Sequence, residues 1–152
     1  MNFSLEIGPK TDLDTIPALK DVYITFLPGG DHKETAEKAG ELVKKGCNPI
    51  PHIPARSIEN DNHLKEYVNM CKDFGVKQCL VIGGSREPVG KFESSIQLLE
   101  TGYFESFKIG IAGHPEGSPD TVSYTHLRAH ETGRNLVCRL LLEKKKINTL
   151  NQ

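Results

Sequence analysis

Short apolar segments recur at regular intervals along this chain and constrain its fold more than any other feature. They occupy 3–7, 22–27, 48–53, 78–82 and 107–112. Their β-branched residues and the lack of strict alternation between apolar and polar positions are typical of strands buried on both faces of a parallel sheet. The last four segments begin about 30 residues apart, which is the length of one βα unit. The sequence therefore predicts an α/β fold.

Helical patterns fill the intervals between the predicted strands. We expect helices over 31–46, 61–75 and 92–101, because apolar residues recur there at helical spacing and a glycine closes each pattern. In the third helix, Ile96 and Leu99 should face the core. Each predicted strand is thus followed by a segment that can return the chain to the start of the next parallel strand.

Two architectures fit this alternation of strands and helices. A closed (β/α)₈ TIM barrel needs about 250 residues, so residues 1–120 would supply about its first five strands with the intervening helices. The alternative is a small open, doubly wound sheet, which the length of the chain favours. The motifs described below reverse that preference, and we predict a partial TIM barrel over 1–120.

The charges of the chain nearly cancel. There are 19 basic and 20 acidic residues, and the net charge is -1. This balance argues against nucleic acid or a membrane surface as a partner and favours a small, near-neutral substrate. With no signal-peptide pattern and no run of 18 apolar residues, we expect a cytoplasmic protein. The four cysteines show neither a C-x-x-C pair nor zinc-ligand spacing, so we expect reduced, mostly buried thiols and no metal.

Candidate functional residues follow from the position of barrel active sites at the carboxyl ends of the strands. The residues at or just after the apolar segments are the candidates. They are Glu6, Thr25, His52, the turn Gly83-Gly84-Ser85, and the segment 113–116 with His114. All of them should face one mouth of the barrel.

Glu6 and His52 carry the most chemistry in this set. Glu6 lies inside an apolar segment, where burial makes ionisation costly and favours a carboxyl group that keeps its proton, as a general acid does. Its alternative role is an ion pair with Lys10. His52 lies in a segment stiffened by prolines, 49–54. It is either a donor to a cofactor oxygen or a core histidine with its hydrogen bonds satisfied.

Two glycine-containing turns follow predicted strands, at 27–31 and 83–85. Glycine lets the backbone approach a ligand closely, and free N–H groups there can bind a nucleotide or flavin phosphate. Neither turn has the G-x-G-x-x-G spacing of a dinucleotide site, however. Both turns equally fit ordinary connections between a strand and a helix.

Four blocks, taken together, resemble the methylenetetrahydrofolate reductase family in order and spacing. The blocks are SLEIGPK at 4–10, YITF at 23–26, PHI at 51–53 and AGHPEGSPD at 112–120. The resemblance covers residues 3–120. Four blocks in register are more specific than any one of them.

The resemblance implies a flavin enzyme with a TIM-barrel fold. In this family NAD(P)H reduces bound FAD, and the flavin passes hydride to 5,10-methylenetetrahydrofolate, which gives 5-methyltetrahydrofolate. Glu6 matches the acid that protonates the folate nitrogen. Thr25 and His52 match flavin contacts, and His114 occupies the position of a usual tyrosine beside the flavin. The resemblance leaves open whether NADH, NADPH or another donor is used.

The chain departs from the family pattern at two places. The family's fourth-strand turn commonly reads Arg-Gly-Asp, and the matching residues here are Gly83-Gly84-Ser85, so the carboxylate is missing unless Glu87 replaces it. The family also has a second histidine in the last of the four blocks, and the matching residue here is Ser118. These differences leave open a subfamily that acts on another folate or pterin.

The pattern of strands and helices stops after residue 120. Residues 121–152 resemble translated sequencing-adapter read-through, and we predict an unrelated tail of non-native origin, helical in part over 136–142. Without the later strands, half a barrel exposes two sheet edges and an apolar inner face. We therefore expect either self-association, which would give a homo-oligomer, or disorder, and no activity from the fragment itself. Two alternative functions remain: a small α/β module that binds flavin or a nucleotide without turnover, and a structural or partner-binding domain.

Overall fold

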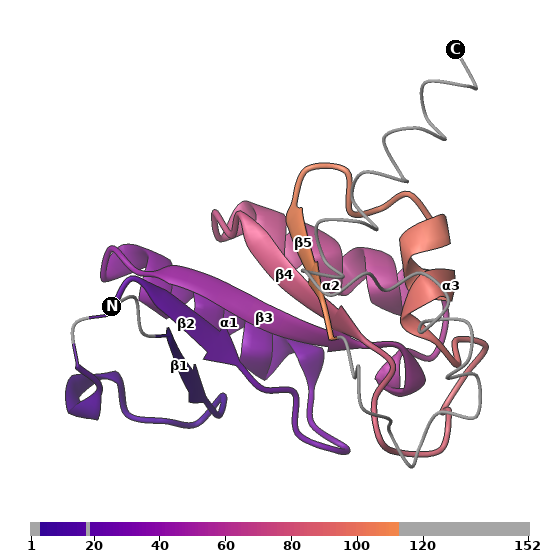
Figure 1. Ribbon diagram of the computed structural model, residues 1–152, viewed down its shortest axis with the longest axis horizontal. Coiled ribbons are helices and arrows are strands. Elements are labelled where there is room, and N and C mark those ends of the chain that lie inside the picture. The colour runs from indigo at the N-terminus through magenta and orange to yellow at the C-terminus, as the bar shows by residue number, and fades with distance from the viewer. Residues whose placement is uncertain (1–3, 18, 113–152) are drawn as a thin grey trace, which may run out of the picture. The chain divides into compact units, whose positions relative to one another are not determined.

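The computed structural model describes residues 4–17 and 19–112 (Figure 1). Contacts between Cα atoms divide the chain into one unit of residues 1–110 and another of residues 111–152. The predicted boundary at 120, the predicted tail helix and His114 lie outside the described residues.

Five strands form one parallel sheet, at the positions that the apolar segments predict. The strands follow one another across the sheet in the order β1-β2-β3-β4-β5 (Figure 1). Their bounds are Ser4–Ile7 for β1, Asp21–Ile24 for β2, Asn48–Pro54 for β3, Gln78–Ile82 for β4 and Lys108–Ile111 for β5. The predicted α/β class is confirmed.

The order of the strands distinguishes between the two predicted architectures. A doubly wound sheet reverses its strand order at a switch point and carries helices on both faces. Here each strand pairs with the one before it in the sequence, and the described strands contain no reversal. Strands are added in this same sequential way in a (β/α)₈ barrel. The described sheet is therefore wound in one direction, which the doubly wound alternative does not predict.

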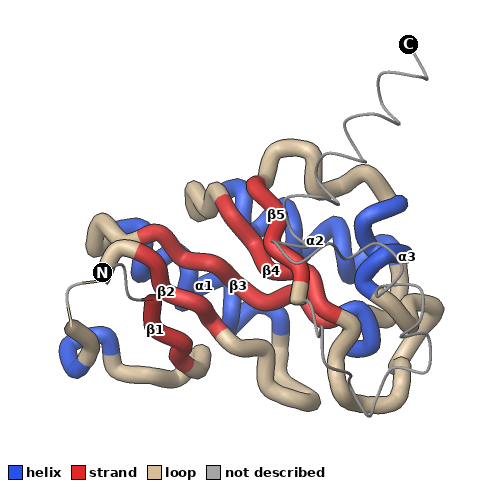
Figure 2. The backbone as a smooth tube through the Cα atoms, in the orientation of Figure 1, coloured by secondary structure: helices blue, strands red, loops and turns tan. Residues whose placement is uncertain are grey.

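Three helices connect the strands, α1 over His32–Lys44, α2 over Asp61–Asp73 and α3 over Ser95–Glu100. Short 3₁₀ turns, η1 at Leu13–Thr15 and η2 at Ala55–Ser57, complete the set. Both α1 and α2 lie behind the sheet in the view of Figure 2. Each of these two helices has its amino end capped by a side chain, and each is followed by a glycine with φ near +80°. The glycine stops that the sequence predicts are therefore confirmed.

The third helix differs from its prediction. It starts at Ser95, where a capping box between Ser94 and Gln97 fixes its first turn. Leu98 is its fully buried residue, whereas Ile96 is 57% exposed. Two positions along a helix differ by roughly 200° around its axis, so burial of Leu98 turns Ile96 to the outside. The prediction that Ile96 faces the core is wrong.

The core lies between the sheet and the helices α1 and α2. Strand residues that point to this side are almost fully buried: Val22, Ile24, Ile53, Cys79 and Val81. The helices contribute Ala36, Ala39, Leu42, Leu64, Val68 and Cys71. Since side chains alternate along a strand, the residues between these core positions share the opposite face of the sheet. That face carries the candidate site.

Candidate functional site

Glu6, Tyr23 and His52 lie on one face of the sheet, on three neighbouring strands. The register pairs Glu6 with Tyr23 and Tyr23 with Ile50, and His52 lies two residues beyond Ile50 on the same side of β3. The rings of Tyr23 and His52 meet edge to face, with centroids 6.1 Å apart and planes at 65°. The fold thus brings two predicted site residues together and adds Tyr23, which the sequence analysis did not single out.

His52 is the buried polar residue of this face, with 8% of its surface exposed. Burial lowers the pKa of its imidazole, and the negative charge of Glu6 acts in the opposite direction. A neutral imidazole can donate one hydrogen bond and accept another. Among the residues that the structure describes, we find no hydrogen-bond partner for the ring nitrogens of His52. Of the two roles that the sequence analysis left open for His52, a core histidine with satisfied ring nitrogens therefore finds no support among the described residues.

The backbone around His52 is fixed from the helix side. Its carbonyl oxygen accepts a hydrogen bond of 2.9 Å from the hydroxyl of Tyr67, a residue of α2 that is fully buried. Pro51 and Pro54 restrict φ on either side of the histidine. Both features hold β3 in a single conformation and so orient the imidazole on the other face.

Glu6 differs from its prediction, because its side chain is exposed. In β1 the buried residue is Ile7, which faces the helices, and Glu6 points the other way. The argument that burial makes Glu6 hold a proton is therefore wrong for the described structure. Its alternative partner is also engaged elsewhere, since Lys10 Nζ lies 3.5 Å from Glu34 Oε1.

Thr25 stands at the carboxyl end of β2, two residues beyond Tyr23. Its N–H donates a hydrogen bond of 2.9 Å to the carbonyl of Ile7, which continues the pairing of β1 and β2 past the last strand residue. The side chain is half-buried. Thr25 is thus at the end of the sheet where the sequence analysis placed the mouth of the site.

The Gly83-Gly84-Ser85 turn lies beside the end of β3. The carbonyl of Gly83 accepts a hydrogen bond of 3.0 Å from the N–H of Arg56. Gly84 has φ of +92°, and a Cβ there would lie 3.3 Å from the Cβ of Pro54. These contacts explain the glycine at position 84 by packing between two loops, so the ordinary-turn interpretation accounts for it without a ligand.

The connection after this turn packs against the loop that precedes α2. A Cβ on Gly90 would lie 1.9 Å from the carbonyl oxygen of Glu59, so only glycine fits there. The carbonyl of Arg56 accepts a hydrogen bond from the N–H of Val89, and the side-chain Nε of Arg56 donates one to the carbonyl of Glu93. The sequence analysis missed this attachment, because nothing in the local sequence identifies the partner of Gly90.

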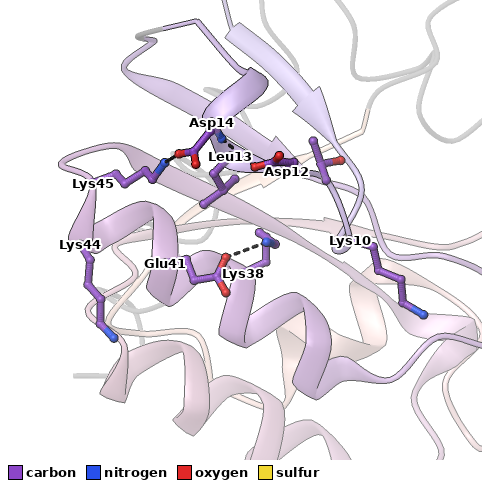
Figure 3. Close-up of a pocket in the computed structure, with 9 residues that line it drawn as sticks. Lys10, Asp12, Leu13, Asp14, Lys38, Glu41, Lys44 and Lys45 are labelled. Atoms are coloured by element: carbon purple, nitrogen blue, oxygen red, sulfur yellow. Dashed lines mark hydrogen bonds and ion pairs between the residues drawn. The ribbon is translucent and has the colours of Figure 1, made fainter.

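A groove of about 500 Å³ lies apart from this face, between α1 and the connection from β1 to β2 (Figure 3). Its charges are largely paired within it. Lys38 lies 2.6 Å from Glu41, and Lys45 lies 2.6 Å from Asp14. The hydrogen bond from Lys45 holds the pKa of Asp14 below its usual value. Because these charges are neutralised locally, we assign the chemistry to the sheet face and not to this groove.

The cysteines agree with their prediction where the structure describes them. Cys47, Cys71 and Cys79 are free thiols, and the last two are buried. Burial raises the pKa of Cys71 to about 12, so this thiol is not a nucleophile near neutral pH. Within residues 4–17 and 19–112, no three side chains are arranged to hold a metal ion. In the same part of the chain, every helix is too short or too polar to cross a bilayer.

A comparison with models of known protein families found none that matches this chain. The assignment of a function therefore rests on the residues of the sheet face and on the sequence blocks that contain them.

Proposed function

We propose that residues 1–120 form about the first five strands of a (β/α)₈ barrel and belong to the methylenetetrahydrofolate reductase family. Enzymes of this family reduce 5,10-methylenetetrahydrofolate with FAD and NAD(P)H. One observation carries the proposal. Glu6 and His52 belong to separate blocks of the sequence that resemble this family. They lie on the same face of the sheet, on β1 and β3, with Tyr23 of β2 between them. Two blocks with unrelated roles would not need to share a face. The sequential strand order supports the same assignment.

Thr25, His52 and the Gly83-Gly84-Ser85 turn are the residues that would hold the flavin. The ring nitrogens of His52 are free among the described residues, and burial lowers the pKa of the ring, so it stays neutral and can donate to a flavin oxygen or nitrogen. Bound FAD would supply the hydride transfer, for which no amino-acid side chain is suited. Ser85 offers a hydroxyl where the family commonly has a carboxylate, so part of the usual contact is missing.

Glu6 would hold and deliver the proton that the folate nitrogen takes up. Its side chain is exposed in the described structure, so it can reach a ligand that binds on this face. His52 would orient the ligand and take no part in the proton transfer.

Flavin titration followed by turnover tests the proposal. Residues 1–120 are joined to the C-terminal half of a methylenetetrahydrofolate reductase, and FAD binding is followed by fluorescence. We expect tight binding and NAD(P)H-dependent turnover. Glu6→Gln should keep FAD bound and lower kcat on the order of a hundredfold or more. Glu37→Gln, the same change at an exposed position of α1, is the control and should leave kcat unchanged.

A folded chimera that binds no flavin would contradict the proposal. Flavin binding without NAD(P)H oxidation, and with no effect of Glu6→Gln, would instead support the second candidate, a module that binds flavin or a nucleotide without turnover. The exposure of Glu6 and the absence of a carboxylate at 83–85 both remove catalytic features, and they are the observations that favour this second candidate over the reductase.

A further inference from the structure

Two histidines meet behind the strand that carries the candidate site. His32 is the first residue of α1 and His63 is the third residue of α2. Their rings lie 4.5 Å apart between centroids, and the ring of His32 lies 5.5 Å from that of Tyr67. His32 has 8% of its surface exposed. The pair therefore forms part of the contact between α1 and α2.

The hydrogen bonding of this pair is incomplete. The Nε2 atoms of both imidazoles are buried and have no hydrogen-bond partner in the described part of the chain. The Nδ1 of His63 accepts a hydrogen bond of 3.3 Å from the N–H of Glu59, so its neutral ring carries the proton on the unpartnered Nε2. Buried polar atoms without partners are uncommon and destabilise the fold. Two of them in one contact indicate a role other than stability.

The charged groups around the pair come from both helices. Asp31 Oδ1 lies 3.3 Å from His32 Nδ1, and Glu66 Oε1 lies 3.7 Å from His32 Nε2. Glu66 is also paired with Lys33 at 3.3 Å, which lowers the pKa of the carboxyl group. Toward the sheet, His32 contacts the buried, uncharged ring of Tyr67. Tyr67 in turn packs beside the ring of Phe26 and donates its hydroxyl to the carbonyl of His52.

These surroundings favour the neutral form of His32. Burial lowers its pKa first, the charge of His63 lowers it further, and Lys33 acts in the same direction, while Asp31 and Glu66 oppose them. A histidine whose pKa is lower in the folded state binds fewer protons when folded than when unfolded. The stability it contributes is present above its ordinary value of 6.5 and is lost as the pH falls below that value.

We infer that the contact between His32 and His63 is a pH-sensitive clamp between α1 and α2, which holds the site strand β3 in place while His32 is neutral and loosens it when His32 is protonated. The connection to the site is Tyr67. Its ring packs beside His32, and its hydroxyl holds the carbonyl of His52. A charge on the pair draws water between the helices, and Tyr67 loses a neighbour that fixes it. The clamp goes beyond the proposed reductase function and does not depend on it.

Unfolding in urea at about pH 7.5 and about pH 5.5 tests the clamp on the full 152-residue chain. When the pH falls from about 7.5 to about 5.5, we expect the unfolding equilibrium constant of the wild type to rise. The rise should be on the order of tenfold larger than in the double variant His32→Gln, His63→Gln. His52→Gln is the comparison variant, because its imidazole is also buried but lies on the other face. It should lose the pH dependence that His52 itself contributes and keep the part that comes from the pair. Equal pH dependence in the wild type and the double variant would overturn the proposal.

A second measurement on the wild type keeps the test decisive if the double variant does not fold. Titration of the Cε1–H signal of His32 by NMR should give a pKa below 6.5. Amide hydrogen exchange, corrected for the intrinsic effect of pH, should quicken in α1, α2 and β3 at the lower pH and stay unchanged in α3. A pKa of His32 at or above 6.5, or exchange that quickens equally in all elements, would also overturn it.

Discussion

The two faces of the sheet are built from alternate residues of the same strands, yet they differ in almost every property. On the helix side, Val22, Ile24 and Ile53 are almost completely buried among aliphatic side chains. On the other side, Glu6 is exposed, Tyr23 and Leu80 are half-buried, and the covered residues belong to β3: Ile50, His52 and Pro54. The stability of this fold therefore comes mainly from one face, and the other face is free to carry polar groups for chemistry.

The largest effect should come from truncating a strand residue on the helix side. Ile53→Ala removes a side chain that is 1% exposed and leaves a cavity against the helices, so we expect a loss of about 2–5 kcal/mol in the free energy of unfolding. Ile82→Ala, one strand away on the half-buried opposite face, should cost clearly less. Urea unfolding of both variants measures the difference. Equal losses would show that the two faces contribute alike.

The next effect concerns the connection that follows β4. Gly90→Ala places a methyl group against the backbone of Glu59, and neither backbone can move freely, so we expect a loss of about 1–3 kcal/mol. Gly83→Ala is the control, because nothing lies within 4 Å of a Cβ at that position. Thermal unfolding compares them. If Gly90→Ala is no worse than the control, the loop is not attached as described.

A smaller effect should follow from removing the link between the two faces. Tyr67→Phe deletes the buried hydroxyl that donates to the carbonyl of His52, and the carbonyl is left without that partner. We expect a loss of about 1–2 kcal/mol in the free energy of unfolding. Tyr103→Phe, at a half-buried tyrosine, should be nearly neutral. If Tyr67→Phe is also neutral, the backbone of β3 does not depend on α2.

The smallest effect tests the electrostatic contact across the site face. The charge of Glu6 raises the pKa of His52 against the larger effect of burial. Glu6→Gln removes this charge, so the pKa of His52 should fall further. NMR titration of the His52 Cε1–H signal measures it, with Glu37→Gln as the control. An unchanged pKa of His52 in Glu6→Gln would show that the charge of Glu6 does not act on the imidazole of His52.

The sequence predicts the elements of this fold well, because they depend on local chemistry. Apolar segments mark all five strands, and glycines that adopt positive φ end α1 and α2 where predicted. The chemistry of Glu6 was predicted less well. The strand β1 alternates polar and apolar residues, with Ser4 and Glu6 on one face, and the structure buries the other face. The alternation that exposes Glu6 also sets Tyr23 beside it.

Contacts between distant segments could not be predicted from single residues. His32 and His63 each look like ordinary residues near the start of a helix, and only the packing of α1 on α2 brings their rings together. Likewise, nothing near Gly90 indicates that Glu59 lies against it. The partner of Tyr67, a backbone carbonyl 15 residues away, has no signature in the sequence.

The sequential order of the strands also determines how this chain can be assembled during synthesis. Each strand finds its partner in the segment made just before it, about one βα unit earlier. No strand has to wait for a distant partner, so the loops that close during folding stay short and their entropic cost stays small. Each new unit can dock on the growing edge as it leaves the ribosome, and the edge it creates is the template for the next.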